Sequence, residues 1–242
     1  TWVRQLGGWV PASWELHKGE ATQPGPPPVA DGYTGDMQLA FINLSAWSAH
    51  GGSVTSLRSH VVAFAEHRLA PSEVRQFKAA YSRSRQDFVA SPAERAAGGT
   101  NHSGVGVLTA PGISADRVPA QTPQFKAWYE VGRAIHVRGA TAGGACHLFV
   151  FYGITKGEDR DEAALRTNAL MDAVCQEAAV TAARAPCLFM GDLNATPSRI
   201  PAVWREVQSG NWVDLGDPLG GGAPAPTCFA TPTSPGTTRD YL

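Results

Sequence analysis

The sequence predicts an α/β fold, because short apolar runs typical of buried strands alternate with longer segments of helical periodicity. The run 187–190 is continuously apolar and leads into a glycine, as expected of a strand covered on both faces. Small and apolar residues recur at helical spacing over 159–183, just before it. With 242 residues, 43% of them hydrophobic, the chain can form one large core. We therefore expect a single domain of layered helices and strands.

Strands and helices are expected in alternation along the chain. The strands are 37–43, 61–66, 105–108, 129–137, 146–152, 187–190 and a short piece near Cys228. The helices are 72–82, 159–183 and a segment from Ile200 that ends at Gly210. We expect Trp204 and Trp212 to lie in the core.

Residues 1–36 differ from the rest and are interpreted as a Pro/Gly-rich N-terminal extension or linker. The stretch 23–28 holds four prolines and cannot continue a helix or a central strand. The domain itself is expected to span 37–242. The chain starts without methionine and stops in a strand-like segment, which predicts a piece of a longer reading frame and a C-terminally incomplete domain.

Charge and cysteine usage narrow the functional classes. The formal net charge of -1 provides no overall field that would attract nucleic acid. The four cysteines form no C-x-x-C pair, which favours buried free thiols and a reducing, intracellular compartment. No apolar run approaches the roughly 20 residues of a membrane span, so we expect no membrane association.

Polar residues with catalytic potential stand directly after the apolar runs. Asp192 and Asn194 follow Gly191, and their spacing of two places both on one side if the chain stays extended. A simple turn explains this segment equally well, because Gly, Asp and Asn are common turn residues. The other runs end comparably: in Asn43, in Glu66 followed by His67 and Arg68, in Tyr152, and in Asp240 within Arg239-Asp240-Tyr241.

These segments, in this order, resemble the motifs of the endonuclease/exonuclease/phosphatase superfamily. Its members are metal-dependent phosphoesterases that include deoxyribonuclease I and abasic-site endonucleases. The resemblance covers 37–242, and Gly-Asp-Leu-Asn after a buried strand is its clearest part. It implies two facing β-sheets flanked by helices, a four-layer sandwich. Spacing alone does not distinguish a sandwich from one open sheet.

The resemblance also implies a role for each motif residue. Glu66, supported by Asn43, would hold Mg²⁺, or Mn²⁺ in its place, since Mg²⁺ needs only one or two protein oxygen ligands. Asp192 would orient or deprotonate the attacking water, while Asn194 and Tyr152 would donate hydrogen bonds to the developing charge. Asp240 would position the family's histidine.

Three departures from the family pattern bear on activity. Ala65 stands where the family usually has Gln, which removes a hydrogen bond that would orient Glu66. Ser45 stands where abasic endonucleases carry an acidic residue. The chain also stops at Leu242, before the family's Ser-Asp-His segment. The last strand or strands are therefore expected to be missing, and the site to be incomplete without its histidine.

Basic residues gather after Glu66 and suggest phosphate binding. The segment 58–85 has six basic residues against two acidic ones, and it could line a phosphate groove. A solvated helix face explains it equally well. The candidate phosphate-binding residues are His67, Arg68 and Asn101.

The predicted function is a Mg²⁺-dependent phosphodiester hydrolase. By resemblance the chain is most similar to retrotransposon-encoded DNA endonucleases. This resemblance implies DNA as the partner, a polymerase region in the same reading frame, a monomeric state and nuclear localisation. The alternatives are a phosphatase of inositol phosphates or another small phosphoester, an RNA exonuclease, and a catalytically inactive relic or nucleic-acid-binding module.

Overall fold

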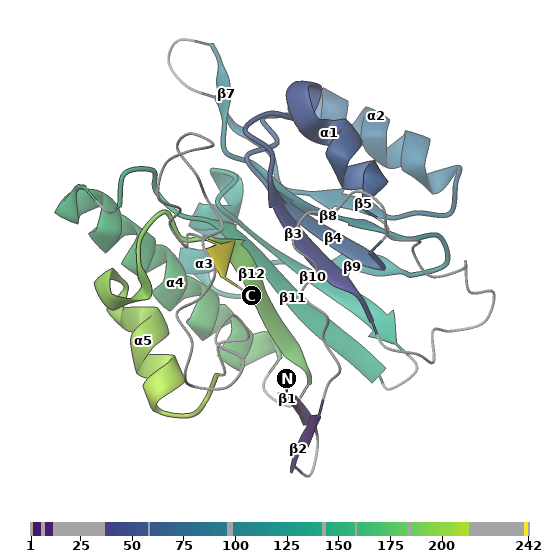
Figure 1. The fold of residues 1–242 in the computed structure, drawn as a ribbon. Coiled ribbons are helices and arrows are strands. Elements are labelled where there is room, and N and C mark those ends of the chain that lie inside the picture. The colour runs from purple at the N-terminus through teal and green to yellow at the C-terminus, as the bar shows by residue number, and fades with distance from the viewer. Residues whose placement is uncertain are drawn as a thin grey trace, which may run out of the picture.

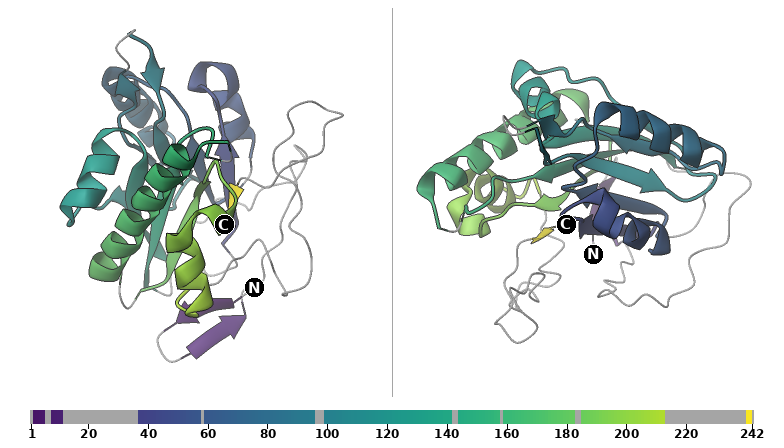
Figure 2. Two further views of the ribbon diagram at one scale, coloured as in Figure 1. Left: turned by 90° about the vertical axis from the view of Figure 1, so that its left-hand side faces the viewer. Right: turned by 90° about the horizontal axis from the view of Figure 1, so that it is seen from above.

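The computed structural model describes residues 2–5, 8–11, 37–57, 59–95, 99–141, 144–157, 159–182, 185–212 and 240–241. Two β-sheets face each other, with helices on both outer sides (Figures 1 and 2). Helices α1 (Trp47–Ser56) and α2 (Pro71–Ser82) cover one sheet. Helices α3 (Pro123–Glu130), α4 (Asp161–Thr181) and α5 (Pro201–Gln208) cover the other. The predicted four-layer α/β architecture is confirmed.

The first sheet has the order β3-β4-β8-β5. Its strands are β3 (Leu39–Asn43), β4 (Val61–Ala65), β8 (Val105–Thr109) and β5 (Phe88–Ala90). Strands β3 and β4 are parallel, so Asn43 and Ala65 end together at one edge of the sheet. Strand β8 runs antiparallel to β4 and β5.

The second sheet has the order β13-β12-β11-β10-β9. Its strands are β13 (Asp240–Tyr241), β12 (Cys187–Asp192), β11 (Gly144–Tyr152), β10 (Ala134–Thr141) and β9 (Ala115–Arg117). Strands β11 and β12 are parallel and pair Tyr152 with Asp192 at their ends.

Three shorter pieces complete the described structure. Strands β1 (Trp2–Gln5) and β2 (Gly8–Pro11) pair with each other, as do β6 (Glu94–Arg95) and β7 (Asn101–His102). A 3-10 turn, η1 (Pro197–Arg199), leads into α5. Among the described residues, no helix combines the length and the apolar character needed to cross a membrane.

Successive side chains of β4 point alternately into two different hydrophobic cores. Val61, Ala63 and Ala65 lie between the two sheets, whereas Val62 and Phe64 pack under α1 and α2. Both faces are therefore covered, and all five residues are buried. This explains why the run is continuously apolar and why the first polar side chain after it reaches the sheet edge.

Several sequence predictions need correction. The strand expected at 129–137 begins only at Ala134, because Thr122 caps α3 and the helix extends to Glu130. Helix α1 was not predicted, because its apolar residues do not follow a clear helical stripe. Trp204 is 49% exposed and is not a core residue. Trp212 is half-buried and stacks on Phe189. The strand near Cys228 and the proline stretch 23–28 lie outside the described residues.

Buried histidines should make the fold sensitive to acid. Burial lowers the pKa of His136 to about 3, assisted by His147, whose Nδ1 lies 2.7 Å from His136 Nε2. Burial also lowers the pKa of His67 to about 4. Because these folded-state values lie below the unfolded value of 6.5, their contribution to stability is complete above pH ~6.5 and declines as pH falls toward the folded values.

We therefore expect the free energy of unfolding to fall by a few kcal/mol, on the order of 1.4 kcal/mol per pKa unit, between pH 7 and pH ~4. Urea denaturation across this range measures it. His136→Gln should flatten the profile, whereas His50→Gln, on the exposed side of α1, should not. Identical profiles for wild type and His136→Gln would contradict the assignment.

Candidate active site

The loop after β4 holds Glu66 and Arg68 in a left-handed backbone, with φ of +58° and +57°. Ser45 and Asn194, in the loops after β3 and β12, share this conformation, with φ of +55° and +53°. Left-handed backbone is costly for residues other than glycine and persists where surrounding contacts enforce it, often at functional sites. Three loops of unusual conformation thus occupy the same end of the two sheets.

Backbone hydrogen bonds hold the loop after β4 in place. The amides of His67 and Arg68 donate to the carbonyls of Gly104 and Ser103, at 3.2 and 3.0 Å. The His67 carbonyl accepts from the Trp47 amide at 2.9 Å. The loop is therefore fixed to both neighbouring segments, and the Glu66 and Arg68 side chains meet in an ion pair.

His67 points the opposite way and requires a correction. Its ring is 1% exposed and packs edge-on against Phe64, with centroids 5.8 Å apart. Its Nδ1 accepts a hydrogen bond from the Leu69 amide at 2.9 Å. Gly104, at φ +91°, leaves room for this ring, since a Cβ there would lie 2.5 Å from it. His67 is a core residue that cannot reach a phosphate, contrary to the sequence prediction.

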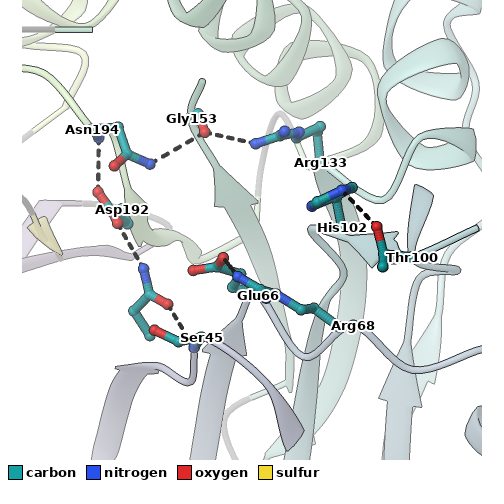
Figure 3. A network of polar contacts seen from close by, with 10 residues as sticks. Ser45, Glu66, Arg68, Thr100, His102, Arg133, Gly153, Asp192 and Asn194 are labelled. Atoms are coloured by element: carbon teal, nitrogen blue, oxygen red, sulfur yellow. Dashed lines mark hydrogen bonds and ion pairs between the residues drawn. The ribbon is translucent and has the colours of Figure 1, made fainter. Parts of the chain in front are cut away.

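Asp192 connects the two sheets at their edge. It is 4% exposed, and its Oδ1 accepts a hydrogen bond from the Asn194 amide at 2.7 Å. Its Oδ2 accepts from Asn43 Nδ2 at 2.8 Å, across 149 positions of sequence. Asn43 Oδ1 in turn accepts from the Ser45 amide (Figure 3). The Asp192 carboxylate is thus held in one orientation by one residue from each sheet.

Tyr152 lies between the two carboxylates of the site. Burial raises the pKa of its hydroxyl, and the negative charges of Glu66 and Asp192 raise it further. The Tyr152 ring also lies under the Arg133 guanidinium, which acts in the opposite direction on this pKa. Glu66 and Asp192 therefore face the same space, and Tyr152 remains a protonated hydrogen-bond donor at neutral pH.

Arg133 belongs to this network but was missed in the sequence. Its guanidinium lies 4.9 Å from the centre of the Tyr152 ring, and its Nη1 donates to the Gly153 carbonyl at 2.8 Å. The same carbonyl accepts from Asn194 Nδ2 at 3.2 Å (Figure 3). Burial lowers the pKa of Arg133, although a guanidinium stays charged. The only sequence signal was a basic residue at the start of an apolar strand.

The structure brings five of the predicted residues into one contact network: Asn43, Glu66, Tyr152, Asp192 and Asn194. Asp240 pairs with Asp192 in the β12–β13 register, so its backbone lies beside the site, while its side chain lies outside the described part. Asn101 Nδ2 donates to the Arg68 carbonyl at 3.1 Å, so Asn101 contacts the backbone of the loop that holds Glu66 and Arg68.

Several solved structures share this arrangement of sheets and helices. An AP endonuclease from Archaeoglobus fulgidus superposes with a TM-score of 0.59 at 14% identity, covering 85% of both chains. A 3' phosphatase from Neisseria bound to a product DNA hairpin superposes with a TM-score of 0.61 at 14% identity and the same coverage. This chain has the deoxyribonuclease I-like fold.

A third deoxyribonuclease I-like structure is the endonuclease domain of TRAS1, a telomere-specific non-LTR retrotransposon. Its TM-score is 0.52 at 11% identity, covering 85% of this chain and 83% of that one. By sequence, no family model and no curated protein matches the chain. At these identities the fold is shared, and the chemistry must be argued from the residues.

The donor atoms of this site fit a magnesium ion. The available groups are the Glu66 carboxylate and the Asn43 amide oxygen, and Mg²⁺ prefers oxygen ligands and retains several waters. Among the described residues, no three His, Cys, Asp or Glu side chains are close enough to hold an ion together. In that part of the chain, the geometry suits a site with one or two protein ligands rather than a three-ligand cage.

The basic segment 58–85 does not form a continuous groove at the site. Helix α2 begins five residues after Glu66 and, at 12 residues, extends roughly 18 Å. The helix leads to β5, which begins at Phe88. Phe88 pairs with Leu108, and Leu108 pairs with Val62, at the end of β4 opposite to Glu66. Arg83 and Arg85 are therefore remote, and within the described part of this segment Arg68 is the basic residue at the carboxylates.

Gly191 should be required for the position of Asp192. A Cβ at Gly191 would lie 2.4 Å from the Phe151 carbonyl oxygen, which is fixed by strand pairing. Gly191→Ala should therefore lower the free energy of unfolding by about 1–3 kcal/mol. Gly52→Ala, with open space around its Cβ in helix α1, is the control and should be neutral or stabilising. Thermal denaturation of both variants measures this, and equal melting temperatures would contradict it.

Proposed function

We propose that this chain is a Mg²⁺-dependent phosphodiester hydrolase that acts on DNA. The observation that carries the proposal is the hydrogen bond from Asn43 to Asp192, which joins the two sheets where Glu66 and Tyr152 also meet. A buried carboxylate held by two donors, beside a second carboxylate whose present partner is the Arg68 guanidinium, suits water activation next to a cation once that carboxylate binds the ion.

The residues of the site then divide the tasks of the reaction among them. Asp192, oriented by Asn43 and the Asn194 amide, accepts a proton from the attacking water. Tyr152, kept protonated, and the side-chain Nδ2 of Asn194 donate hydrogen bonds to charge that develops on the phosphate. Glu66 and Asn43 would hold Mg²⁺, whose positive charge would offset that of the phosphate. Arg68 contacts an adjacent phosphate.

Asp240 is assigned to the same end of the sheet by its pairing with Asp192. There it would position a histidine that completes the reaction. The proposal does not depend on the Gln that the family usually places at Ala65. Ala65 is fully buried between the sheets, and in this structure the Arg68 guanidinium holds Glu66 instead.

The more specific assignment is a DNA endonuclease of the retrotransposon type, monomeric, nuclear and followed by a polymerase region. It is supported by the superposition on the TRAS1 endonuclease domain. The Neisseria phosphatase, solved with a DNA hairpin, supports DNA as substrate and keeps phosphatase activity as the second candidate. A small phosphoester, an RNA or no substrate at all are the remaining outcomes of a direct test.

The test is hydrolysis of supercoiled plasmid, single-stranded RNA, a 3'-phosphorylated oligonucleotide and an inositol phosphate, each with Mg²⁺, Mn²⁺ or EDTA. We expect metal-dependent plasmid nicking that is lost in Asp192→Ala. Release of phosphate from the oligonucleotide without nicking would favour the phosphatase. Inactivity on all four substrates, together with DNA binding, would favour the noncatalytic module.

A further inference from the structure

Arg68 occupies the carboxylate that is assigned to the metal. Its guanidinium forms an ion pair with Oε1 of Glu66, and the left-handed backbone at both residues turns the two side chains toward each other. A divalent cation at Glu66 would therefore lie a few ångströms from a fixed positive charge. Two like charges at such a distance repel unless one of them moves away.

We infer that Arg68 is an exchangeable counterion of Glu66: a nucleic-acid phosphate draws Arg68 away and thereby favours metal binding at Glu66. This inference rests on the proposed function, because it assumes that Glu66 binds the cation. It goes beyond that function by making the affinities for metal and for the polyanion depend on each other.

The two partners differ in their freedom to move. The Arg68 side chain is 40% exposed, whereas that of Glu66 is 15% exposed. Arg68 also has the longer and more flexible side chain, and its planar guanidinium matches a phosphate as well as a carboxylate. Exchange therefore requires only that Arg68 swing toward solvent, where a phosphate backbone would lie.

The surroundings preserve the site when Arg68 leaves. The backbone of Arg68 stays fixed, because its amide donates to Ser103 and its carbonyl accepts from Asn101 Nδ2. The Glu66 side chain is itself only 15% exposed and stays near Tyr152, whose pKa its charge helps to raise. The loop thus keeps the carboxylate in place, and only its positive partner changes.

Coupling between the two ligands must be reciprocal. If a phosphate removes Arg68 from Glu66 and so strengthens metal binding by some factor, the metal strengthens phosphate binding by the same factor. For a divalent ion about 5 Å from a partly exposed charge, the dielectric of water together with screening by roughly 0.1 M salt gives a factor of roughly 5–10.

Isothermal titration with Mg²⁺ tests this, with and without a short phosphorothioate DNA duplex that keeps its charge but resists hydrolysis. The proteins are wild type, Arg68→Gln and Arg75→Gln, the last being an equal charge change on an exposed position of α2. Without DNA, Arg68→Gln should bind Mg²⁺ about 5- to 10-fold more tightly than wild type. DNA should tighten Mg²⁺ binding in wild type and in Arg75→Gln, but much less in Arg68→Gln.

The outcomes separate this inference from the function on which it rests. If Mg²⁺ binds in a Glu66-dependent manner, but Arg68→Gln matches wild type with and without DNA, the exchange is wrong and the hydrolase proposal stands. If none of the three proteins binds Mg²⁺ under either condition, both proposals are wrong. Melting temperatures of the variants establish that each is folded.

Discussion

Asp192→Asn should lower the rate of phosphodiester hydrolysis by about 10²- to 10⁴-fold, the usual contribution of a positioned general base. The variant keeps the size of the side chain but removes its proton-accepting charge. Both oxygens of Asp192 accept hydrogen bonds, from Asn43 Nδ2 and from the Asn194 backbone amide. The NH₂ group of an asparagine would face one of these two donors, so one hydrogen bond is lost. We therefore also expect a loss of roughly 1–3 kcal/mol in the free energy of unfolding.

Initial rates of plasmid nicking at saturating Mg²⁺, together with urea denaturation, measure both effects. Asp116→Asn is the matched control, because Asp116 is exposed on β9, away from the network. It should retain wild-type activity and stability. A folded Asp192→Asn protein with activity within about twofold of wild type would exclude Asp192 as the base.

Glu66→Gln should weaken Mg²⁺ binding by more than the roughly 10- to 100-fold that is typical when a group outside the ligand shell is removed. Glutamine keeps the shape and one oxygen but loses the charge that attracts the ion. It also leaves Arg68 without its ion-pair partner at the site. Isothermal titration with Mg²⁺ and Mn²⁺ measures the affinity directly.

A second measurement for Glu66 does not require catalysis. Excess Mg²⁺ should raise the melting temperature of wild type, because a ligand that binds only the native state stabilises it. It should have no such effect on Glu66→Gln. Glu130→Gln on α3, with a side chain 61% exposed, is the control and should respond like wild type. Equal Mg²⁺ affinities in all three proteins would remove Glu66 from the metal site.

Much of the fold could be predicted because its strands carry strong local patterns. Strands β4 and β12 are apolar on both faces, so a continuous hydrophobic run reveals them without knowledge of their partners. The first polar residue beyond such a run emerges at a sheet edge, which is why Glu66 and Asp192 could be proposed. Helix α1 gave no comparable signal, because its apolar residues form no clear stripe. The helix is stabilised by tertiary packing of Trp47 against Phe64 and Phe88.

The sequence by itself determined the layered α/β architecture and the polar residues at the strand ends, because both follow from local periodicity. Only the tertiary structure decided which of those residues meet. The left-handed backbone at Glu66 and Arg68 breaks the extended alternation, so His67 turns into the core while its two neighbours share the site. The hydrogen bond from Asn43 to Asp192 and the position of Arg133 over Tyr152 depend on two sheets packing face to face. Such contacts join distant segments through the shape of the whole core, which no local pattern encodes.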